Sequence, residues 1–370
     1  IHNWTNPFWR ADQPGAMQYT NREALGDQSC PLPATNDTSS GFCSAGALPA
    51  LAVEALEPAH VQATVRFALL HNLRLSIKST GHDIMGRSTA PGSLNLWLHR
   101  LKRITFHDDD DPPASFIPAG CPSSSSSPAV TAGAGTQWQD LYEAAEERNV
   151  VVVGAMSASV SVAGGFLQGG GHSPLSPLLG MAADQVLELS VVTADGQLRK
   201  ASPCQNPDLF WALRGGGGST FGVVVSSTLR TFPPLEALVG LHLLVVSQSA
   251  SRFQELLAVF VQLQASMVNG KVRGCAGYSY MSASQGVFAL TLNYLFPNVS
   301  EPGIAEAYFA PLRTYMARYP EELRVLNSST YRYSSFREWH RAVLCSASPG
   351  ICTDRTGSNA AVASRLLPEA

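Results

Sequence analysis

Three glycine-bearing loops are the places where this chain could bring its backbone close to a ligand. They read STGHDIMGRS at 79–88, AGGFLQGGGHS at 163–173 and RGGGGSTFG at 214–222. Because glycine lacks a β-carbon, backbone amides in such loops can approach a phosphate group or a flat ring. No loop reads GxGxxG at the start of a helix and no GxxxxGK[ST] occurs, which argues against a Rossmann or P-loop site. Glycines that serve only tight turns are the alternative for any single loop.

His82, in the first loop, is a side chain that could form a covalent bond to a cofactor. It stands between Gly81 and Asp83. A neutral imidazole nitrogen is a competent nucleophile near neutral pH, so it can attach to a cofactor. A lone histidine is more often a packing or surface residue, and its place in a glycine loop is what favours the chemical role.

Predicted strands adjoin each loop and would hold it in place. Hydrophobic spacing predicts a helix from Pro58, a strand at 73–77 before the first loop and another at 93–98 after it. A buried strand at 150–153 precedes the second loop, and strands at 186–193 and 223–229 follow the second and third loops; a turn and a return strand at 197–200 make the first of these a hairpin. Residues 107–127 hold runs of aspartate and serine, and we expect weak order there.

The composition limits the kinds of partner that this chain could bind. The chain has 370 residues, of which 45% are hydrophobic and 14% charged, and its net charge is -3. A core of ordinary size is therefore possible, and no excess of positive charge favours nucleic acid or an anionic membrane as a partner. The uncharged stretch 149–183 is broken by glycines and prolines, so we expect no membrane span. We expect a small-molecule ligand, a monomer and no metal site.

Two adjacent prolines, Pro233 and Pro234, divide the pattern of predicted elements. Beyond them we predict strands at 241–246, 275–281 and 286–295 and helices at 251–267 and 301–316. The predicted organisation is an irregular segment at 1–44, one domain at 45–234 and a second, α+β domain at 235–370.

Cysteines and sequons indicate an oxidising compartment. Cys30 with Cys43 and Cys345 with Cys352 flank short loops that suit disulfides, although free buried thiols are the alternative. Four glycosylation sequons begin at residues 3, 36, 298 and 327, and the chain starts at Ile1, as after removal of a signal peptide. We therefore predict a secreted glycoprotein.

The segments around the three loops resemble FAD-linked oxidases of the vanillyl-alcohol oxidase superfamily, in its berberine-bridge-enzyme-like fungal branch. These segments are KSTGHDIMGRSTAPGSLNLWLHRLKRI, SVSVAGGFLQGGGHSPLSPLLGMAADQVLELSVVTADG and NPDLFWALRGGGGSTFGVV. The resemblance covers roughly residues 45 to 235. It implies a two-domain α+β fold, with a PCMH-type FAD-binding domain and an α+β substrate domain that roofs the flavin.

The resemblance also implies which residues bind FAD. His82 matches the histidine that is bonded to the flavin, and the residues around it match the loop that holds the pyrophosphate. The implied set beside His82 is Ser79, Thr80, Gly81, Asp83, Gly86, Arg87 and Ser88 in the first loop, and Gly164, Gly165, Gly169, Gly170, Gly171 and His172 in the second.

The sequence departs from the family pattern in two places. Many relatives carry a second flavin-linking cysteine where this chain reads Met156-Ser157-Ala158. A serine hydroxyl is too weak a nucleophile to replace a thiolate, so we predict one covalent bond, through His82. Relatives usually continue past a point like Ala370 with a segment that carries a tyrosine near the flavin. Either the chain is a piece or its site is assembled differently, and we therefore name no catalytic base.

The implied activity is that of an FAD-dependent oxidase, which transfers hydride from a substrate alcohol to flavin and yields hydrogen peroxide from dioxygen. A flavin dehydrogenase with another electron acceptor and a non-catalytic binding protein are the alternatives. As the expected substrate, a carbohydrate ranks slightly ahead of a phenolic alcohol or a secondary-metabolite precursor. Tyr278, Tyr280, Tyr294 and Tyr333 could stack on a substrate ring, but we expect them to pack in the core.

Overall fold

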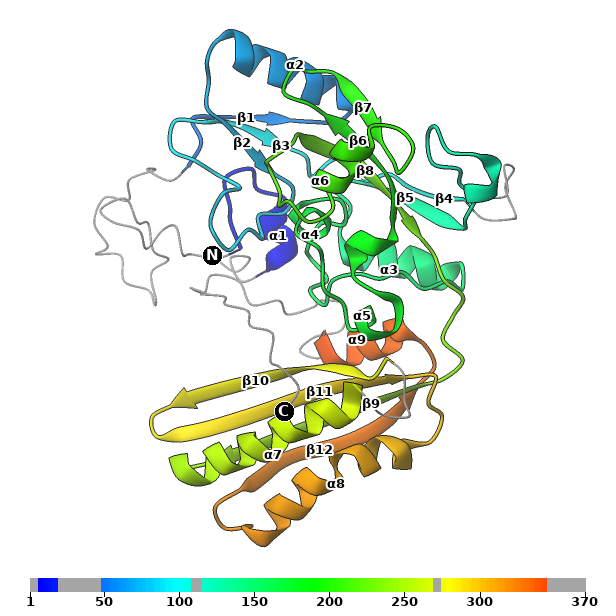
Figure 1. The fold of residues 1–370 in the computed structure, drawn as a ribbon. Coiled ribbons are helices and arrows are strands. Elements are labelled where there is room, and N and C mark those ends of the chain that lie inside the picture. Colours follow the sequence, from blue (N-terminus) through cyan, green and yellow to red (C-terminus); the bar gives the residue numbers. More distant parts are fainter. Residues whose placement is uncertain (1–5, 19–47, 108–114, 269–273, 345–370) are drawn as a thin grey trace, which may run out of the picture.

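Three β-sheets and the helices around them make up residues 6–18, 48–107, 115–268 and 274–344, which the structure, a computed structural model, describes (Figure 1). Two sheets lie in the N-terminal part, and the third forms a separate layer with its own helices (Figure 1). The mixture of helices and sheets confirms the predicted α+β class.

The first sheet is parallel and positions the first glycine loop. Its strand order is β1-β3-β2, with β1 at Leu51–Glu54, β3 at Leu94–Trp97 and β2 at Leu75–Lys78. The helix expected from Pro58 is present as α2, Pro58–Leu70, and a short helix α1, Pro7–Ala11, precedes the sheet. The first glycine loop begins directly after β2, at the carboxyl end of a parallel strand, where ligands of open α/β sheets commonly bind.

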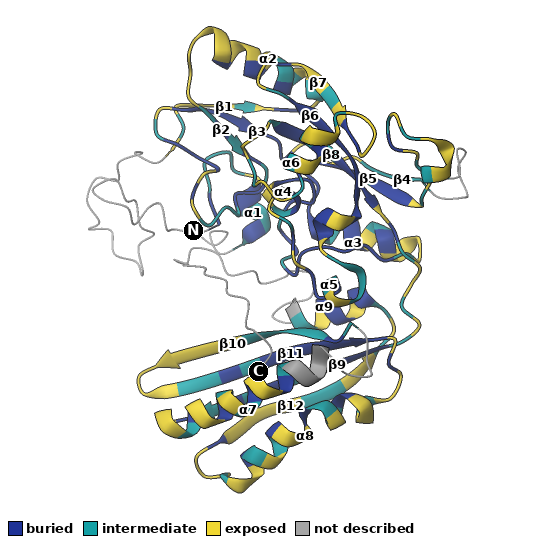
Figure 2. Ribbon diagram, in the orientation of Figure 1, coloured by how far each residue is buried: buried dark blue, intermediate teal, exposed yellow. Residues whose placement is uncertain are grey.

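The second sheet has five antiparallel strands in the order β4-β5-β8-β6-β7. The strands are β4 at Ile104–His107, β5 at Ala129–Gly133, β6 at Val186–Val192, β7 at Leu198–Ala201 and β8 at Val223–Arg230. Every residue of β6 is buried, as its dark colour in Figure 2 shows, and β6 pairs with β7 as the predicted hairpin. The predicted strand at 150–153 is wrong, because this segment forms only an isolated bridge from Val151 to Phe232.

Short helices connect these strands. They are α3 at Trp138–Glu147, α4 at Gly165–Gln168, α5 at Ser176–Leu179, α6 at Pro207–Ala212 and the 3-10 turns η1 at Ser123–Ser125 and η2 at Ala182–Gln185. The second glycine loop therefore contains one helical turn, α4, and the third follows α6.

The third sheet is antiparallel, in the order β10-β11-β9-β12, and it has two different faces. Its strands are β9 at Leu238–Ser247, β10 at Ala276–Ser284, β11 at Val287–Pro297 and β12 at Arg324–Tyr333, with helices α7 at Ala250–Val268 and α8 at Pro302–Arg318. Leu241, Leu243 and Val245 alternate along β9 into a core shared with α7 and α8. The residues between them face the other way, because side chains alternate along a strand.

The last described helix, α9 at Phe336–Leu344, returns to the N-terminal part of the fold. Phe336 and Trp339 belong to the hydrophobic core of the first two sheets. Arg337 of this helix is ion-paired with Glu143 and Glu146 of α3. The predicted boundary at residue 234 stays a prediction, and β12 and α9 were not foreseen because we predicted no element beyond residue 316.

One disulfide, which we did not predict, joins Cys121 to Cys204 in the described residues. It ties the segment 115–127 to the end of β7, and Phe116 and Ser127 form a bridge there. The expected weak order is therefore wrong for this half of 107–127. The cysteines for which we expected loop disulfides lie outside the described residues, as do two of the sequons, while Asn298 and Asn327 are exposed.

Candidate cofactor site

A cavity of about 1400 Å³ opens between the three glycine loops and the third sheet. This volume exceeds the range of roughly 300 to 1,000 Å³ that is usual for drug-sized ligands, so a dinucleotide-sized molecule can be accommodated. The first loop contributes all of its residues from Ser79 to Ser88 except Gly86, the second contributes Gly164 and Gly165 among others, and the third contributes Gly218, Ser219 and Gly222. Glycine loops that are far apart in the sequence thus line one space.

Ten of the fourteen residues expected to bind FAD line this cavity. They are Ser79, Thr80, Gly81, His82, Asp83, Arg87, Ser88, Gly164, Gly165 and His172. Gly86, Gly169, Gly170 and Gly171 do not line it. Gly170 and Gly171 have φ of 106° and 69°, and a β-carbon on Gly171 would lie 2.8 Å from the Phe166 ring. These two glycines turn and pack the chain.

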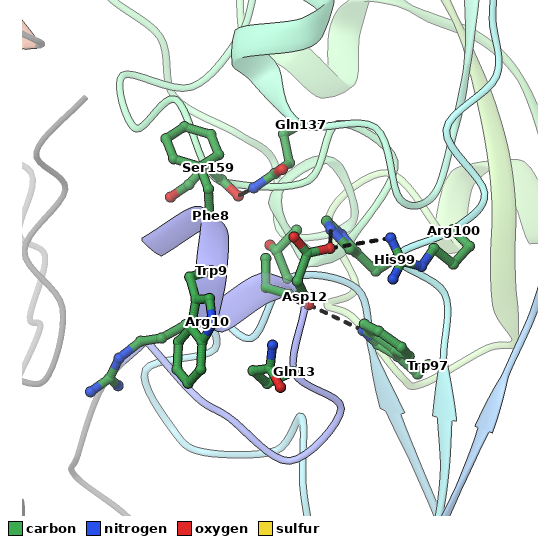
Figure 3. Close-up of polar contacts among 12 residues, drawn as sticks. Phe8, Trp9, Arg10, Asp12, Gln13, Trp97, His99, Arg100, Gln137 and Ser159 are labelled. Carbon is green, nitrogen blue, oxygen red and sulfur yellow. Dashed lines mark hydrogen bonds and ion pairs between the residues drawn. The ribbon is translucent and has the colours of Figure 1, made fainter. Parts of the chain in front are cut away.

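His82 is half-buried and is held by a buried hydroxyl. Its Nε2 lies 2.7 Å from Oγ of Ser159, a residue with 0% exposure. The carbonyl oxygen of Ser159 accepts a hydrogen bond of 2.8 Å from Nε2 of Gln137, which precedes α3, and Figure 3 shows Gln137 alongside Ser159. The imidazole orientation is therefore set by Ser159, which precedes the second glycine loop, and by Gln137 at the start of α3. No sequence signal pointed to Ser159.

Asp83 and Arg87 shape the first loop. The carboxylate of Asp83 accepts a hydrogen bond of 2.6 Å from the backbone amide of Arg87 and forms an ion pair of 2.6 Å with its guanidinium. The hydrogen bond to Asp83 raises the pKa of Arg87, which stays charged. The pair closes the loop around Gly86, whose amide bonds to the carbonyl of Asp83.

The N-terminal segment 6–18 fastens the strand that leads to His82. The amide of Gln18 donates to the carbonyl of Gly81 over 2.9 Å, and its side-chain Nε2 donates to the carbonyl of Thr80 over 3.0 Å. Gly81 has φ of 84°, and a β-carbon there would lie 2.9 Å from the carbonyl oxygen of Ala16. We predicted only an irregular segment here, because hydrogen bonds to backbone carbonyls leave no pattern in residue types.

Two buried titratable side chains, Lys78 and His99, contact the same N-terminal segment. Lys78 is 1% exposed and donates to the carbonyls of Arg10 and Gln13, while His99, also buried, places Nε2 at 3.2 Å from Asp12. In Figure 3, dashed lines join Asp12 to both His99 and Arg100. Burial lowers the pKa of Lys78 to about 7 and the pKa of His99 to about 4.

The Lys78 amine should make stability rise with pH above neutrality. Its pKa falls from 10.5 to about 7 on folding, so between these values the unfolded chain holds a proton that the native chain lacks. The unfolding free energy should therefore increase by about 1.4 kcal/mol per pH unit in this window from this group alone. Urea unfolding at pH 7.5 and 9.5 tests this.

Lys78→Met should remove that rise, whereas Lys102→Met, at an exposed position near Lys78 and His99, should keep it. If the unfolding free energies of the wild-type protein and Lys78→Met rise equally with pH, the buried amine of Lys78 is not the source of the rise.

The third sheet supplies the side of the cavity opposite the glycine loops. Tyr278, Tyr280, Thr291 and Asn293 line it from β10 and β11. The expectation of core packing is therefore wrong for Tyr278 and Tyr280, which sit on the face of the sheet away from α7 and α8. Tyr294 is in the core, as expected, and donates to Gln264 over 3.1 Å. Tyr333 packs against the first core.

Contacts cross the cavity between the glycine loops and this sheet. Nδ1 of His172 lies 3.0 Å from the hydroxyl of Tyr278, and burial raises the pKa of Tyr278 well above its usual value. Asn293 bonds to Nδ1 of His242 on the neighbouring strand over 2.5 Å. Met156 and Ser157, at the position where relatives carry the linking cysteine, also line the cavity.

The residues of the cavity fit FAD. A β-carbon added to Gly165 would meet no atom within 4 Å, so the wall there is bare backbone, open to a flat or phosphorylated group. Among the described residues, no group bonds to the buried Oε1 of Gln168, which also lines the cavity. An acceptor of this kind suits the hydroxyl and ring N–H donors of FAD.

Neither a metal site nor a membrane span is found within the described residues. No group of three or more His, Cys, Asp or Glu there is arranged to hold a metal ion. No helix in the same ranges is both long enough and apolar enough to cross a bilayer.

Comparison with known proteins agrees with this site. Residues 49–202 match the family described as FAD binding domain. An uncharacterized FAD-linked oxidoreductase of Arthroderma benhamiae is 39% identical over 324 residues, which cover 85% of this chain and 53% of the relative. An FAD-linked oxidoreductase named easE, of Trichophyton verrucosum, is 38% identical over 369 residues, covering 97% of this chain and 58% of the relative.

Solved structures give the same fold. The crystal structure of a VAO-type flavoprotein from Myceliophthora thermophila C1 matches with a TM-score of 0.81 and 27% identity, covering 97% of this chain and 61% of that one. The chain thus spans little more than half of the length of the proteins it matches. With FAD as its cofactor, it belongs to the FAD-linked oxidoreductases of the vanillyl-alcohol oxidase type.

Proposed function

We propose that the protein is an FAD-dependent oxidase that removes hydride from an alcohol carbon of a small molecule and passes the electrons to dioxygen. The observation that carries the proposal is the position of His82 in the wall of the cavity that all three glycine loops line. When bound, FAD supplies the two-electron acceptor, and its reoxidation by dioxygen gives hydrogen peroxide.

His82 would hold the cofactor through a covalent bond, and the loop around it would hold the pyrophosphate. If Nε2–H of His82 donates to Ser159, the lone pair of the neutral ring lies on Nδ1, which we assign as the bonding nitrogen. Ser157 lines the cavity at the second linking position but carries only a hydroxyl, so we propose a single bond.

Ser159→Ala should slow attachment of the flavin, because the buried hydroxyl holds the orientation of the His82 ring. We expect about 10-fold slower formation of covalent flavin, as for other partners that orient a reactive histidine. The measurement is the time course of acid-resistant flavin after FAD is added to flavin-free protein.

Ser161→Ala is the matched control for this prediction. Ser161 is another buried serine of the same segment, and its hydroxyl donates to the carbonyl of Ala134 instead. Equal rates for the two variants would show that Ser159 does not act through His82.

A carbohydrate is the substrate class that the sheet side of the cavity favours. Tyr278 and Tyr280 offer aromatic faces, while Thr291 and Asn293 offer a hydroxyl and an amide beside them. Aromatic faces with a few placed polar groups suit a sugar, which has apolar C–H faces and many hydroxyls. A phenolic alcohol would use the aromatic faces alone.

Secretion, glycosylation and a monomeric state are also proposed. The exposure of Asn298 and Asn327, each in a sequon, and the disulfide between Cys121 and Cys204 support an extracellular location. Treatment with a glycosidase that removes N-linked glycans should lower the mass of the protein from its native host.

The visible absorption spectrum of the purified protein, before and after acid precipitation, tests the proposed function. Yellow colour that stays with the pellet means covalent flavin. Bleaching by cellobiose with formation of peroxide supports an oxidase, and bleaching under air without peroxide means a dehydrogenase. A folded protein that neither holds nor takes up flavin would be a binding protein and would contradict the proposal.

A further inference from the structure

The pair formed by His172 and Tyr278 is the feature of the cavity that flavin binding alone does not explain. The two residues are 106 positions apart, on opposite sides of the cavity, and their Nδ1 and hydroxyl atoms are 3.0 Å apart. Both line the same space as His82. Their rings are tilted by 49°, with centroids 5.8 Å apart, so the contact is made through the polar atoms rather than by stacking.

Each partner is fixed by its own element. The amide of Ala182 donates to the carbonyl of Gly171 over 2.8 Å, and the amide of Ala183 donates to that of Gly170 over 3.0 Å, so the backbone before His172 is anchored. On the other side, Tyr278 is in register with Asn293 of β11, which is bonded in turn to His242 of β9. The pair is therefore preorganised, as a catalytic pair must be.

We propose that Tyr278 and His172 form a proton relay that accepts the hydroxyl proton of the substrate alcohol; this inference rests on the proposed function. As the O–H bond of the alcohol breaks, its proton goes to the Tyr278 oxygen and the Tyr278 proton goes to Nδ1 of His172. The hydride leaves the adjacent carbon, with its electron pair, for the bound oxidant. A carbonyl compound and an imidazolium result, and the imidazolium returns its proton to water.

The chemistry of the two groups explains why both are needed. Burial keeps Tyr278 a neutral phenol at working pH, so it cannot serve alone as a base and must pass its proton on. His172 is exposed to solvent, so its imidazole can take the proton and release it to water. Two titratable side chains, Tyr280 and Tyr142, interact electrostatically with Tyr278. The other titratable side chains of the same cavity are His82, Asp83 and Arg87.

The test compares rates of flavin reduction by cellobiose without oxygen in the flavin-loaded protein and its variants. His172→Gln and Tyr278→Phe should each reduce the rate by about 100-fold, the lower range for general base catalysis. His172→Gln should also lose the acidic limb of the pH profile. His172→Ala should regain activity with added imidazole, which a packing role would not allow. Tyr331→Phe, at an exposed position on β12, and His71→Gln, at an exposed position after α2, are the controls.

A readout independent of turnover is the 15N chemical shift of Nδ1 in His172 without substrate. Tyr278→Phe should shift this resonance, because it removes the hydrogen bond, and an unchanged resonance would overturn the relay. Equal reduction rates in the wild-type protein and His172→Gln would also overturn it while leaving the oxidase intact. If the wild-type protein keeps its flavin but neither cellobiose nor 4-hydroxybenzyl alcohol reduces that flavin, the proposed function fails, and the relay fails with it.

Discussion

His82→Ala should fold and bind FAD but release all of it on acid precipitation. We propose the ring nitrogen of His82 as the nucleophile of the first glycine loop, and the serine at position 157 cannot replace it. The colour of the pellet should therefore move entirely to the supernatant. Because a covalent bond to histidine would also make the flavin a better oxidant, we expect turnover to fall by about 10-fold or more.

The control for this prediction is His71→Ala, at an exposed position after α2. It should keep flavin in the pellet at the level of the wild-type protein. Flavin that remains in the pellet of His82→Ala would assign the bond to another residue and would remove the role given to His82, while the oxidase activity could persist.

Gly165→Val should abolish FAD binding while the protein stays folded. A β-carbon at this first residue of α4 meets no protein atom within 4 Å, so it causes no clash inside the chain. The new side chain would instead occupy the cavity beside Gly218, whose own β-carbon position lies 3.1 Å from the α-carbon of Gly165. We expect at least a 100-fold weaker affinity for FAD, measured by titration of flavin-free protein and by thermal unfolding.

Gly303→Val separates this effect from the cost of valine in a helix. Gly303 lies in the first turn of α8, is exposed, and also has no atom within 4 Å of an added β-carbon, but it does not line the cavity. It should lose a little stability and no flavin. Normal flavin content in Gly165→Val would mean that the cofactor does not lie against α4.

Local sequence pattern by itself determined much of the N-terminal part. The helix that begins at Pro58 and the hairpin of β6 and β7 follow from hydrophobic periodicity and turn residues, which act over a few residues. The three loops and His82 were identifiable because glycine and histidine are chemically distinctive in a short segment.

Tertiary structure decided which of these residues share a space and what supports them. Ser159 reaches His82 across 77 positions, and Tyr278 reaches His172 across 106, and neither pair leaves a trace in residue spacing. Hydropathy likewise assigned Tyr278 to the core, because an aromatic residue on a strand looks the same whether it faces helices or a cavity. The physical reason is that hydrophobic periodicity indicates which face of a strand or helix is buried. Only the packing of elements that are distant in sequence determines what that face is buried against.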